Sequence, residues 1–431
     1  MLLLAVVVTP ASAAPDIQAW TTDNGARVLF IEAREIPLVE AQVTFAAGAA
    51  RDGEHPGIAH LVSDLLMSGT TKRDADALAT ALERDGAEVS TGAARDMGWV
   101  EFRSLSADEL LWPVADTVAG MLARPAFPAG EIQRLKDLRR TELENERQSP
   151  GALASRAFWE ALYGDHPYGH LPLGSEESLA AIGRADLQAF HDRYYVARNA
   201  NIAIVGDLDR RSAERLARTL VQSLPAGEPA AELPPPPDPG EARTIERAFP
   251  STQAHVTLGH VGVARGFAQW PALYVANHVL GGGGFTSRLM TEVREKRGLV
   301  YGIGSRFSPM AVPGPFRVTL QTRGDQAGRA LEIVRSEIER FIEDGPTEAE
   351  LEDAKRNIVG GFPLQIDSNA ELAGYIAMIG FYDLPLDYLD RFRERAQAVD
   401  REAARQAVKT VMADVPLITV IVGGDRAEGG S

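Results

Sequence analysis

The sequence predicts an α+β fold built from two similar domains, and three observations lead to it. A proline-dense stretch at residues 224–243 divides the 431-residue chain into halves of similar length. Proline at that density excludes a helix or a central strand. Similar segments recur in the two halves at nearly constant spacing. Each half also mixes strand patterns with helix patterns, which is typical of α+β domains.

The recurring segments indicate a duplication. "NIAIVGDLD" near the end of the first half matches "LITVIVGGDR" near the end of the second, so that Ile204 corresponds to Ile421, 217 positions later. "FPAGEIQRLKDL" matches "GPTEAELEDAKRN", with Lys136 corresponding to Lys355, 219 positions later. Two independent matches at nearly one offset are hard to obtain by chance. The period is far too long for a solenoid and indicates two related domains.

The first half contains strand and helix signals in alternation. Residues 74–90 predict a helix, because Leu78 and Leu82 lie one helical turn apart and Gly86 then acts as a stop. An Asn-Gly turn signal precedes the first β-rich run, and a later run alternates like a half-buried strand. The predicted strands lie at residues 23–32, 38–49 and 97–106.

One long amphipathic helix stands out in the second half, at residues 326–345. Its apolar side chains fall on one helical face, namely Leu331, Val334, Ile338 and Phe341. Thr347 and Glu350 then form the pattern of a capping box, which predicts the start of a further helix.

The apolar start of the chain predicts a signal peptide at residues 1–14. Ala11-Ser12-Ala13 fits the small-x-small pattern of a secretory cleavage site, and the run is too short to span a bilayer. No Lys or Arg precedes the run, so a true start further upstream is an alternative. A buried N-terminal strand is disfavoured by Pro10 and the alanines. We therefore expect a periplasmic or secreted protein with domains at 15–223 and 244–431, joined by the linker at 224–243.

Composition narrows the function classes. The chain has 44 basic and 60 acidic side chains, a formal net charge of −16. This balance argues against a nucleic-acid partner or an anionic membrane surface, since both require basic patches. The sequence has no cysteine, which excludes disulfides, thiolate metal sites and cysteine nucleophiles.

Residues 57–70, "GIAHLVSDLLMSGT", predict a buried helix that carries a single histidine. An inverted zinc motif, H-x-x-E-H, places two His ligands at i and i+4, with a Glu between them as general base. Here the five positions are His60-Leu61-Val62-Ser63-Asp64, so only the first ligand is kept. Asp64 can in principle ligate zinc through oxygen, but Ser63 cannot act as a carboxylate base. His60 is therefore either a core residue or the remnant of a metal site.

The frame around His60 resembles the signature of the pitrilysin, insulysin and mitochondrial processing peptidase family. Three further stretches resemble the same family in order, "HPYGHLPLG", "IAIVGD" and "LGGGGFTSRLMTEVREKRGLVYGIGS". By this resemblance, the third zinc ligand falls at Glu142, and a supporting acid falls near Leu135, where it is missing. The resemblance implies a chain that lacks the base, one His ligand and one supporting acid. Such a chain does not hydrolyse peptides by itself.

The second domain keeps the other part of that family's active site. The resemblance assigns an Arg and a Tyr seven residues apart to Arg294 and Tyr301, in "VREKRGLVY". An arginine fork can bind a peptide carboxylate or carbonyl, and a phenol can donate to an oxyanion. The glycine run Gly281–Gly284 lacks a following G-K-[ST], so it is no phosphate loop. We expect Gly281, Gly282, Gly283 and Gly284 to contact substrate, or to form a plain connector between helices.

The resemblance implies one half of a clamshell, a non-catalytic subunit of a heterodimeric zinc peptidase. This chain would hold no cofactor, and zinc would be bound by a homologous partner with an intact H-x-x-E-H. Arg294 and Tyr301 would then act on a peptide in the partner's active site. Two alternatives remain open, a catalytically silent scaffold or peptide-binding protein, and a residual zinc peptidase using His60, Asp64 and Glu142.

Overall fold

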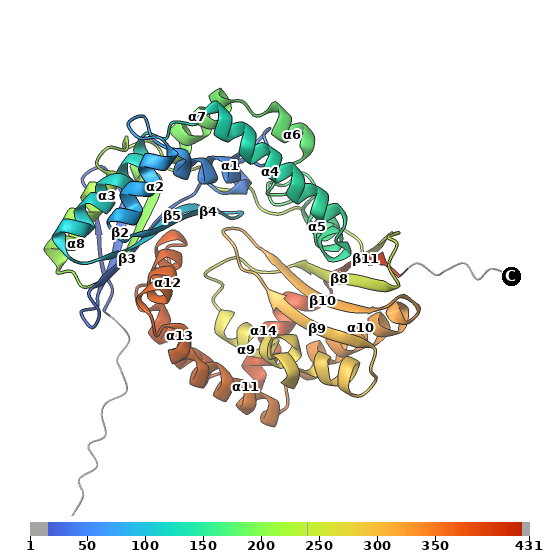
Figure 1. Cartoon of the computed structure of the whole chain (residues 1–431). Coiled ribbons are helices and arrows are strands. Elements are labelled where there is room, and N and C mark those ends of the chain that lie inside the picture. Colours follow the sequence, from blue (N-terminus) through green and yellow to red (C-terminus); the bar gives the residue numbers. More distant parts are fainter. Residues whose placement is uncertain (1–15, 239, 425–431) are drawn as a thin grey trace, which may run out of the picture.

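The computed structural model describes residues 16–238 and 240–424. These residues form two mixed β-sheets, each flanked by helices, and together they curve into an open arch (Figure 1). The predicted α+β class is confirmed. The predicted signal peptide at residues 1–14 lies outside the described residues. Within the described part, no helix is both long enough and apolar enough to cross a bilayer.

The first sheet has six strands in the order β1-β2-β6-β3-β5-β4. Neighbouring strands are antiparallel except β2 and β6, which are parallel. The strands span β1 (Gln18–Thr21), β2 (Arg27–Glu32), β3 (Leu38–Phe45), β4 (Glu88–Ala93), β5 (Gly98–Leu105) and β6 (Ala200–Gly206). All three strands predicted in this half are present, as β2, β3 and β5.

The second sheet has five strands and repeats the topology of the first without an equivalent of β1. Its order is β7-β11-β8-β10-β9, and only β7 and β11 are parallel. The strands span β7 (Arg243–Arg247), β8 (Gln253–Val261), β9 (Val300–Phe307), β10 (Pro315–Arg323) and β11 (Ile418–Gly423). The matched segments around Ile204 and Ile421 are β6 and β11, which hold equivalent places. The duplication inferred from the sequence is thus visible in the strand order.

Fourteen α-helices lie in the described ranges. Those of the first half are α1 (Ile58–Leu65), α2 (Ala75–Arg84), α3 (Asp108–Ala123), α4 (Ala129–Arg147), α5 (Pro150–Tyr163), α6 (Glu176–Ala181), α7 (Arg184–Tyr194) and α8 (Arg210–Val221). Those of the second half are α9 (Trp270–Asn277), α10 (Ala327–Asp344), α11 (Glu348–Gly361), α12 (Asn369–Phe381), α13 (Tyr388–Gln397) and α14 (Arg401–Met412).

The helix signals in the sequence correspond to real helix ends and faces. Leu78 and Leu82 are the buried leucines of α2, and the Asp74 carboxylate caps its first turn. The four apolar residues predicted to share a face of α10 are all buried. Thr347 and Glu350 form the predicted capping box at the start of α11.

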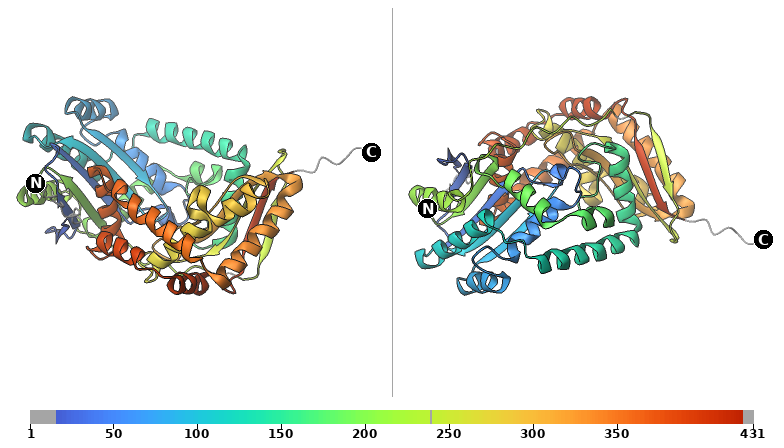
Figure 2. Two further views of the ribbon diagram at one scale, coloured as in Figure 1. Left: turned by 90° about the horizontal axis from the view of Figure 1, so that it is seen from below. Right: turned by 90° about the horizontal axis from the view of Figure 1, so that it is seen from above.

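Each sheet is covered on one face by a helix from the other half of the chain. Residues of α12, including Ile376, pack against Leu29 of β2 and Val205 of β6. Residues of α5, including Phe158, pack against Val420 of β11. Figure 2 shows this arrangement from two further sides, with orange-red helices of the second half beside blue strands of the first half. Each half thus has a core of its own, and two further apolar clusters are shared between the halves.

The proline-rich segment is extended and is held against the first half by polar contacts. No helix or strand occurs in its described residues before Arg243, where β7 begins. The His166 ring lies 2.9 Å from the Pro234 carbonyl oxygen, and the Asn199 side chain accepts a hydrogen bond of 3.0 Å from the Ala230 amide. These contacts hold the segment against the first domain.

Asp96 joins the two halves through buried hydrogen bonds. Its carboxylate is 6% exposed and accepts from the Tyr168 hydroxyl, which belongs to the first half. It also accepts from the Tyr382 hydroxyl at 2.9 Å and from the Ala311 amide at 2.9 Å, both in the second half. One buried side chain therefore connects three segments that are far apart in the sequence.

Candidate functional site

The position of α1 is set by Asp52 and by the "HPYGHLPLG" stretch. The Asp52 carboxylate accepts from the Gly57 amide at 2.7 Å and from the Ala59 amide at 3.0 Å, which satisfies the free amides of the first turn. His170 lies 3.1 Å from the same carboxylate. Gly57 adopts a φ of +99°, and a side chain there would collide with the Leu173 carbonyl oxygen.

His60 and Ser63 are polar groups in an apolar setting. The His60 Nε2 and the Ser63 hydroxyl are both buried, and neither has a hydrogen-bond partner in the described part of the chain. Burial lowers the pKa of His60 to about 4, and the positive charges of Arg139 and Arg95 act in the same direction. The imidazole is therefore neutral near pH 7.

Asp64 and Glu142 are brought together, as the resemblance implied, but an arginine lies between them. Arg139 of α4 donates from Nη2 to Asp64 and from Nη1 to Glu142, the latter at 2.5 Å. Burial raises the pKa of Asp64, and the charge of Arg139 opposes that shift. Arg139 was missed by the sequence reasoning. The available signal was an Arg three residues before Glu142, on one helix with it and with the buried Leu135.

These residues do not fit a zinc ion as they stand. Two of the three potential ligands are hydrogen-bonded to a guanidinium, whose charge repels a divalent cation. Across residues 16–238 and 240–424, no group of three or more His, Cys, Asp or Glu side chains is arranged to hold a metal.

The structure also brings Arg294 and Tyr301 together. Arg294 lies on the π-helical segment η6 (Met290–Glu295), and Tyr301 is the second residue of β9. The Arg294 Cζ is 5.8 Å from the centre of the Tyr301 ring and 5.1 Å from that of Phe285. Tyr301 is 85% exposed and Phe285 is 68% exposed. The result is a half-buried cation that lies against two exposed aromatic rings.

Phe285 was also missed by the sequence reasoning, although it follows the glycine run directly. Phe285 and Tyr301 are both exposed and both lie against the Arg294 guanidinium, and a group of exposed apolar side chains, unlike a single one, is typical of an interaction surface.

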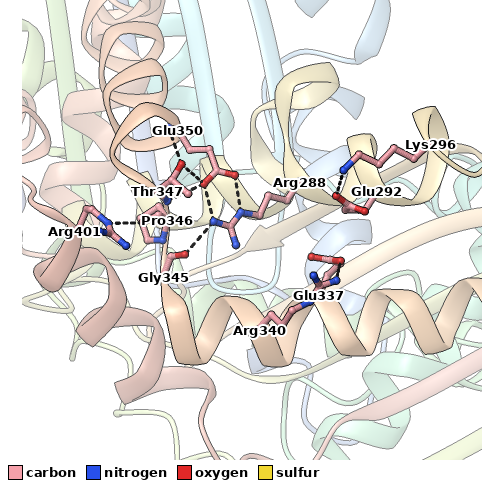
Figure 3. Close-up of polar contacts among 10 residues, drawn as sticks. All are labelled: Arg288, Glu292, Lys296, Glu337, Arg340, Gly345, Pro346, Thr347, Glu350 and Arg401. Carbon is pink, nitrogen blue, oxygen red and sulfur yellow. Dashed lines mark hydrogen bonds and ion pairs between the residues drawn. The ribbon is translucent and has the colours of Figure 1, made fainter.

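Other cations around the Arg294–Tyr301 pair are already paired with carboxylates. Arg288 binds Glu350 through two hydrogen bonds of 2.6 Å and the Gly345 carbonyl at 3.0 Å (Figure 3). Glu292 is engaged by Lys296 at 2.5 Å and by Arg297 at 2.7 Å. The Arg288 contacts join the residues just before η6 to α11, and the other two contacts pair Glu292 with cations that follow it in the chain.

The glycine run has a packing role in the structure. A side chain at Gly281 would lie 2.5 Å from the Ser305 hydroxyl and 2.6 Å from its amide, so glycine allows the segment η4 (His278–Gly282) to press onto β9. A side chain at Gly283 would likewise lie 2.7 Å from the His278 carbonyl oxygen. Gly282 and Gly284 are exposed, and Gly284 has a φ of +62°.

Replacing Gly281 with alanine is expected to lower the free energy of unfolding by about 1–3 kcal/mol, because the new methyl group overlaps the backbone of β9. Gly302→Ala on the same strand is the matched control, since no atom lies within 4 Å of the place its methyl group would take and φ is not left-handed. Urea unfolding of both variants measures the difference. Equal stabilities would contradict the packing role.

Comparisons with known proteins agree with the duplicated architecture. Residues 27–174 match the profile described as insulinase, peptidase family M16, and residues 181–358 match the profile of the peptidase M16 inactive domain. An uncharacterized zinc protease of Streptomyces coelicolor is 28% identical, over 85% of this chain and 80% of its own length. Another from Bacillus subtilis is 26% identical, over 82% of this chain and 85% of its own length.

Solved structures extend the similarity over nearly the whole chain. The crystal structure of a peptidase M16 inactive domain from Pseudomonas fluorescens is 39% identical, with a TM-score of 0.93, and the match covers 96% of this chain and 98% of that one. A Helicobacter pylori protease shares the fold, with a TM-score of 0.87 at 20% identity over 95% of this chain and 99% of its own. This chain belongs to the M16 family of peptidases.

Proposed function

We propose that this chain is the non-catalytic subunit of a two-subunit zinc peptidase. Its role is to supply Arg294 and Tyr301 to the active site of a homologous partner that carries an intact H-x-x-E-H. The observation that carries the proposal is the pair itself, the half-buried Arg294 of η6 beside the exposed Tyr301 of β9. In the first half, by contrast, Ser63 of α1 occupies the base position, and Arg139 of α4 pairs with both Asp64 and Glu142.

The chemistry of the pair suits a peptide carbonyl. The Arg294 fork binds a carboxylate or carbonyl oxygen of the peptide and orients it. The Tyr301 hydroxyl donates a hydrogen bond to the oxygen that becomes negatively charged as water adds. A zinc ion held by the partner would supply Lewis acidity and an activated water when bound. Together the two subunits would enclose an unfolded or short peptide, and we place the complex in the periplasm or outside the cell.

Strand β9 offers a place for the peptide backbone. It is the edge strand of the second sheet, next to a groove of about 300 Å³. Gly302 and Gly304 of β9, Gln321 of β10 and Ser155 of α5 line that groove. An extended peptide can pair with a free sheet edge through main-chain hydrogen bonds. The exposed Gly282 and Gly284 leave the neighbouring loop without side chains that would block such a strand.

A reconstitution assay tests the proposal. The partner is the M16 homologue with H-x-x-E-H from the same organism, and its gene is first sought beside that of this chain. Peptide cleavage is measured with this chain alone, with the partner alone and with the mixture. Activity is expected only in the mixture, because each chain supplies one part of the site. Equal activity of the partner alone would contradict the proposal.

Two other functions make different predictions. The first is a silent scaffold or peptide-binding protein, which is favoured by the loss of the base at Ser63. In that case, Arg294→Ala and Tyr301→Phe would leave the partner's proteolysis unchanged. For a residual zinc peptidase, the isolated chain would contain stoichiometric zinc that disappears in His60→Ala.

A further inference from the structure

We propose that Arg139 is a built-in substitute for the metal ion of this fold. Its guanidinium cross-links Asp64 and Glu142 and offsets one of their two negative charges, and it thereby prevents a divalent cation from binding to them. The inference uses the ligand positions that the family resemblance assigns, and it does not depend on any peptidase activity of the complex.

The geometry of Arg139 is that of a bridge between two helices. Asp64 lies on α1 and Glu142 on α4, and the two helices pack against each other. Each terminal nitrogen of Arg139 binds one carboxylate. The Arg139 side chain is only 14% exposed, so the contact is largely sheltered from water and from screening salt. A rigid, planar fork suits this task better than the single point charge of a lysine.

The groups around Arg139 also indicate that no divalent cation binds here. The His60 Nε2 and the Arg139 Nε are both buried without a hydrogen-bond partner among the described residues. A divalent ion that took Asp64 and Glu142 as ligands would first have to displace the guanidinium. The displaced cation would have to remain in the same largely buried space or move out into water. Arg139 therefore opposes metal binding by charge and by occupancy.

Without the guanidinium, the Asp64 and Glu142 carboxylates should be free to turn toward His60 and to hold a metal ion together with it. Three such N and O ligands are a set that zinc accepts. The wild-type chain, dialysed against zinc and then against metal-free buffer, is expected to retain no stoichiometric zinc and to show no zinc-dependent rise in Tm. Arg139→Ala is expected to melt at a lower temperature without metal. It should then retain about one zinc per chain and regain Tm when zinc is added.

Two further variants make the test decisive. Arg139→Ala combined with Glu142→Gln removes one ligand and is expected to lose the zinc response of Arg139→Ala alone. Arg139→Gln is the substitute if the alanine variant does not fold, because it keeps much of the side-chain volume without the charge. Cobalt absorbance gives a second readout of the ligand set.

Two outcomes would overturn the proposal. One is stoichiometric zinc in the wild-type chain that is lost in His60→Ala. The other is folded Arg139→Ala and Arg139→Gln proteins that take up no metal. Neither readout involves a partner or a peptide. A failed reconstitution assay would therefore leave this result intact, and the reverse also holds.

Discussion

Tyr301→Phe is expected to lower kcat of the reconstituted two-subunit peptidase by about 10²–10³-fold, the usual effect of removing one oxyanion donor. KM should change little, because the hydroxyl acts on charge that develops only in the transition state. Tyr301 is 85% exposed, so the fold and the pairing of the subunits should be preserved. Steady-state kinetics of the mixture measure kcat and KM, and far-UV circular dichroism of the variant checks that its fold is preserved.

The matched control for this prediction is Tyr375→Phe. It also removes a phenol hydroxyl from the second half of the chain, one that donates to Gln365 at 2.9 Å. It should leave kcat unchanged. If Tyr301→Phe retains full activity in the mixture, the hydroxyl takes no part in catalysis and the silent scaffold becomes the better interpretation.

Asp96→Ala is expected to lower the free energy of unfolding by about 3 kcal/mol, roughly 1 kcal/mol for each of the hydrogen bonds that it removes. The variant would leave the Tyr168 hydroxyl, the Tyr382 hydroxyl and the Ala311 amide without their shared acceptor. Buried donors without partners are costly, and here they come from both halves of the chain. Equilibrium denaturation in urea measures the loss.

Tyr382→Phe provides the comparison for Asp96→Ala. It removes one of the three hydrogen bonds and leaves the carboxylate with two donors, so a loss of about 1 kcal/mol is expected. A loss in Asp96→Ala no larger than that of Tyr382→Phe would show that Asp96 does not hold the halves together.

The sequence predicted the local elements well because they depend on local chemistry. Leu78 and Leu82 repeat at helical spacing, and Thr347 with Glu350 caps α11 through side chains three residues apart. The duplication was equally readable, because corresponding strands keep the same pattern of apolar residues wherever they lie in the chain.

The candidate sites were only partly predictable. The resemblance located Asp64, Glu142, Arg294 and Tyr301, and the structure brings each pair together. Arg139 and Phe285 were not identified, because each gains its importance from a neighbour on another element. Arg139 faces α1 only once α4 has packed against it. Phe285 meets Arg294 only through the turn between the glycine run and η6.

The sequence by itself determined the two related halves, their strands and helices, and the loss of the H-x-x-E-H pattern. Only the tertiary structure decided which sheet each helix covers, and therefore that α5 and α12 are exchanged between halves. The physical reason is that the apolar pattern of a helix shows that one face must be buried, but it does not show which sheet that face packs against. The guanidinium between Asp64 and Glu142 was decided in the same way, since a charged side chain finds its counter-ions only after the helices have met.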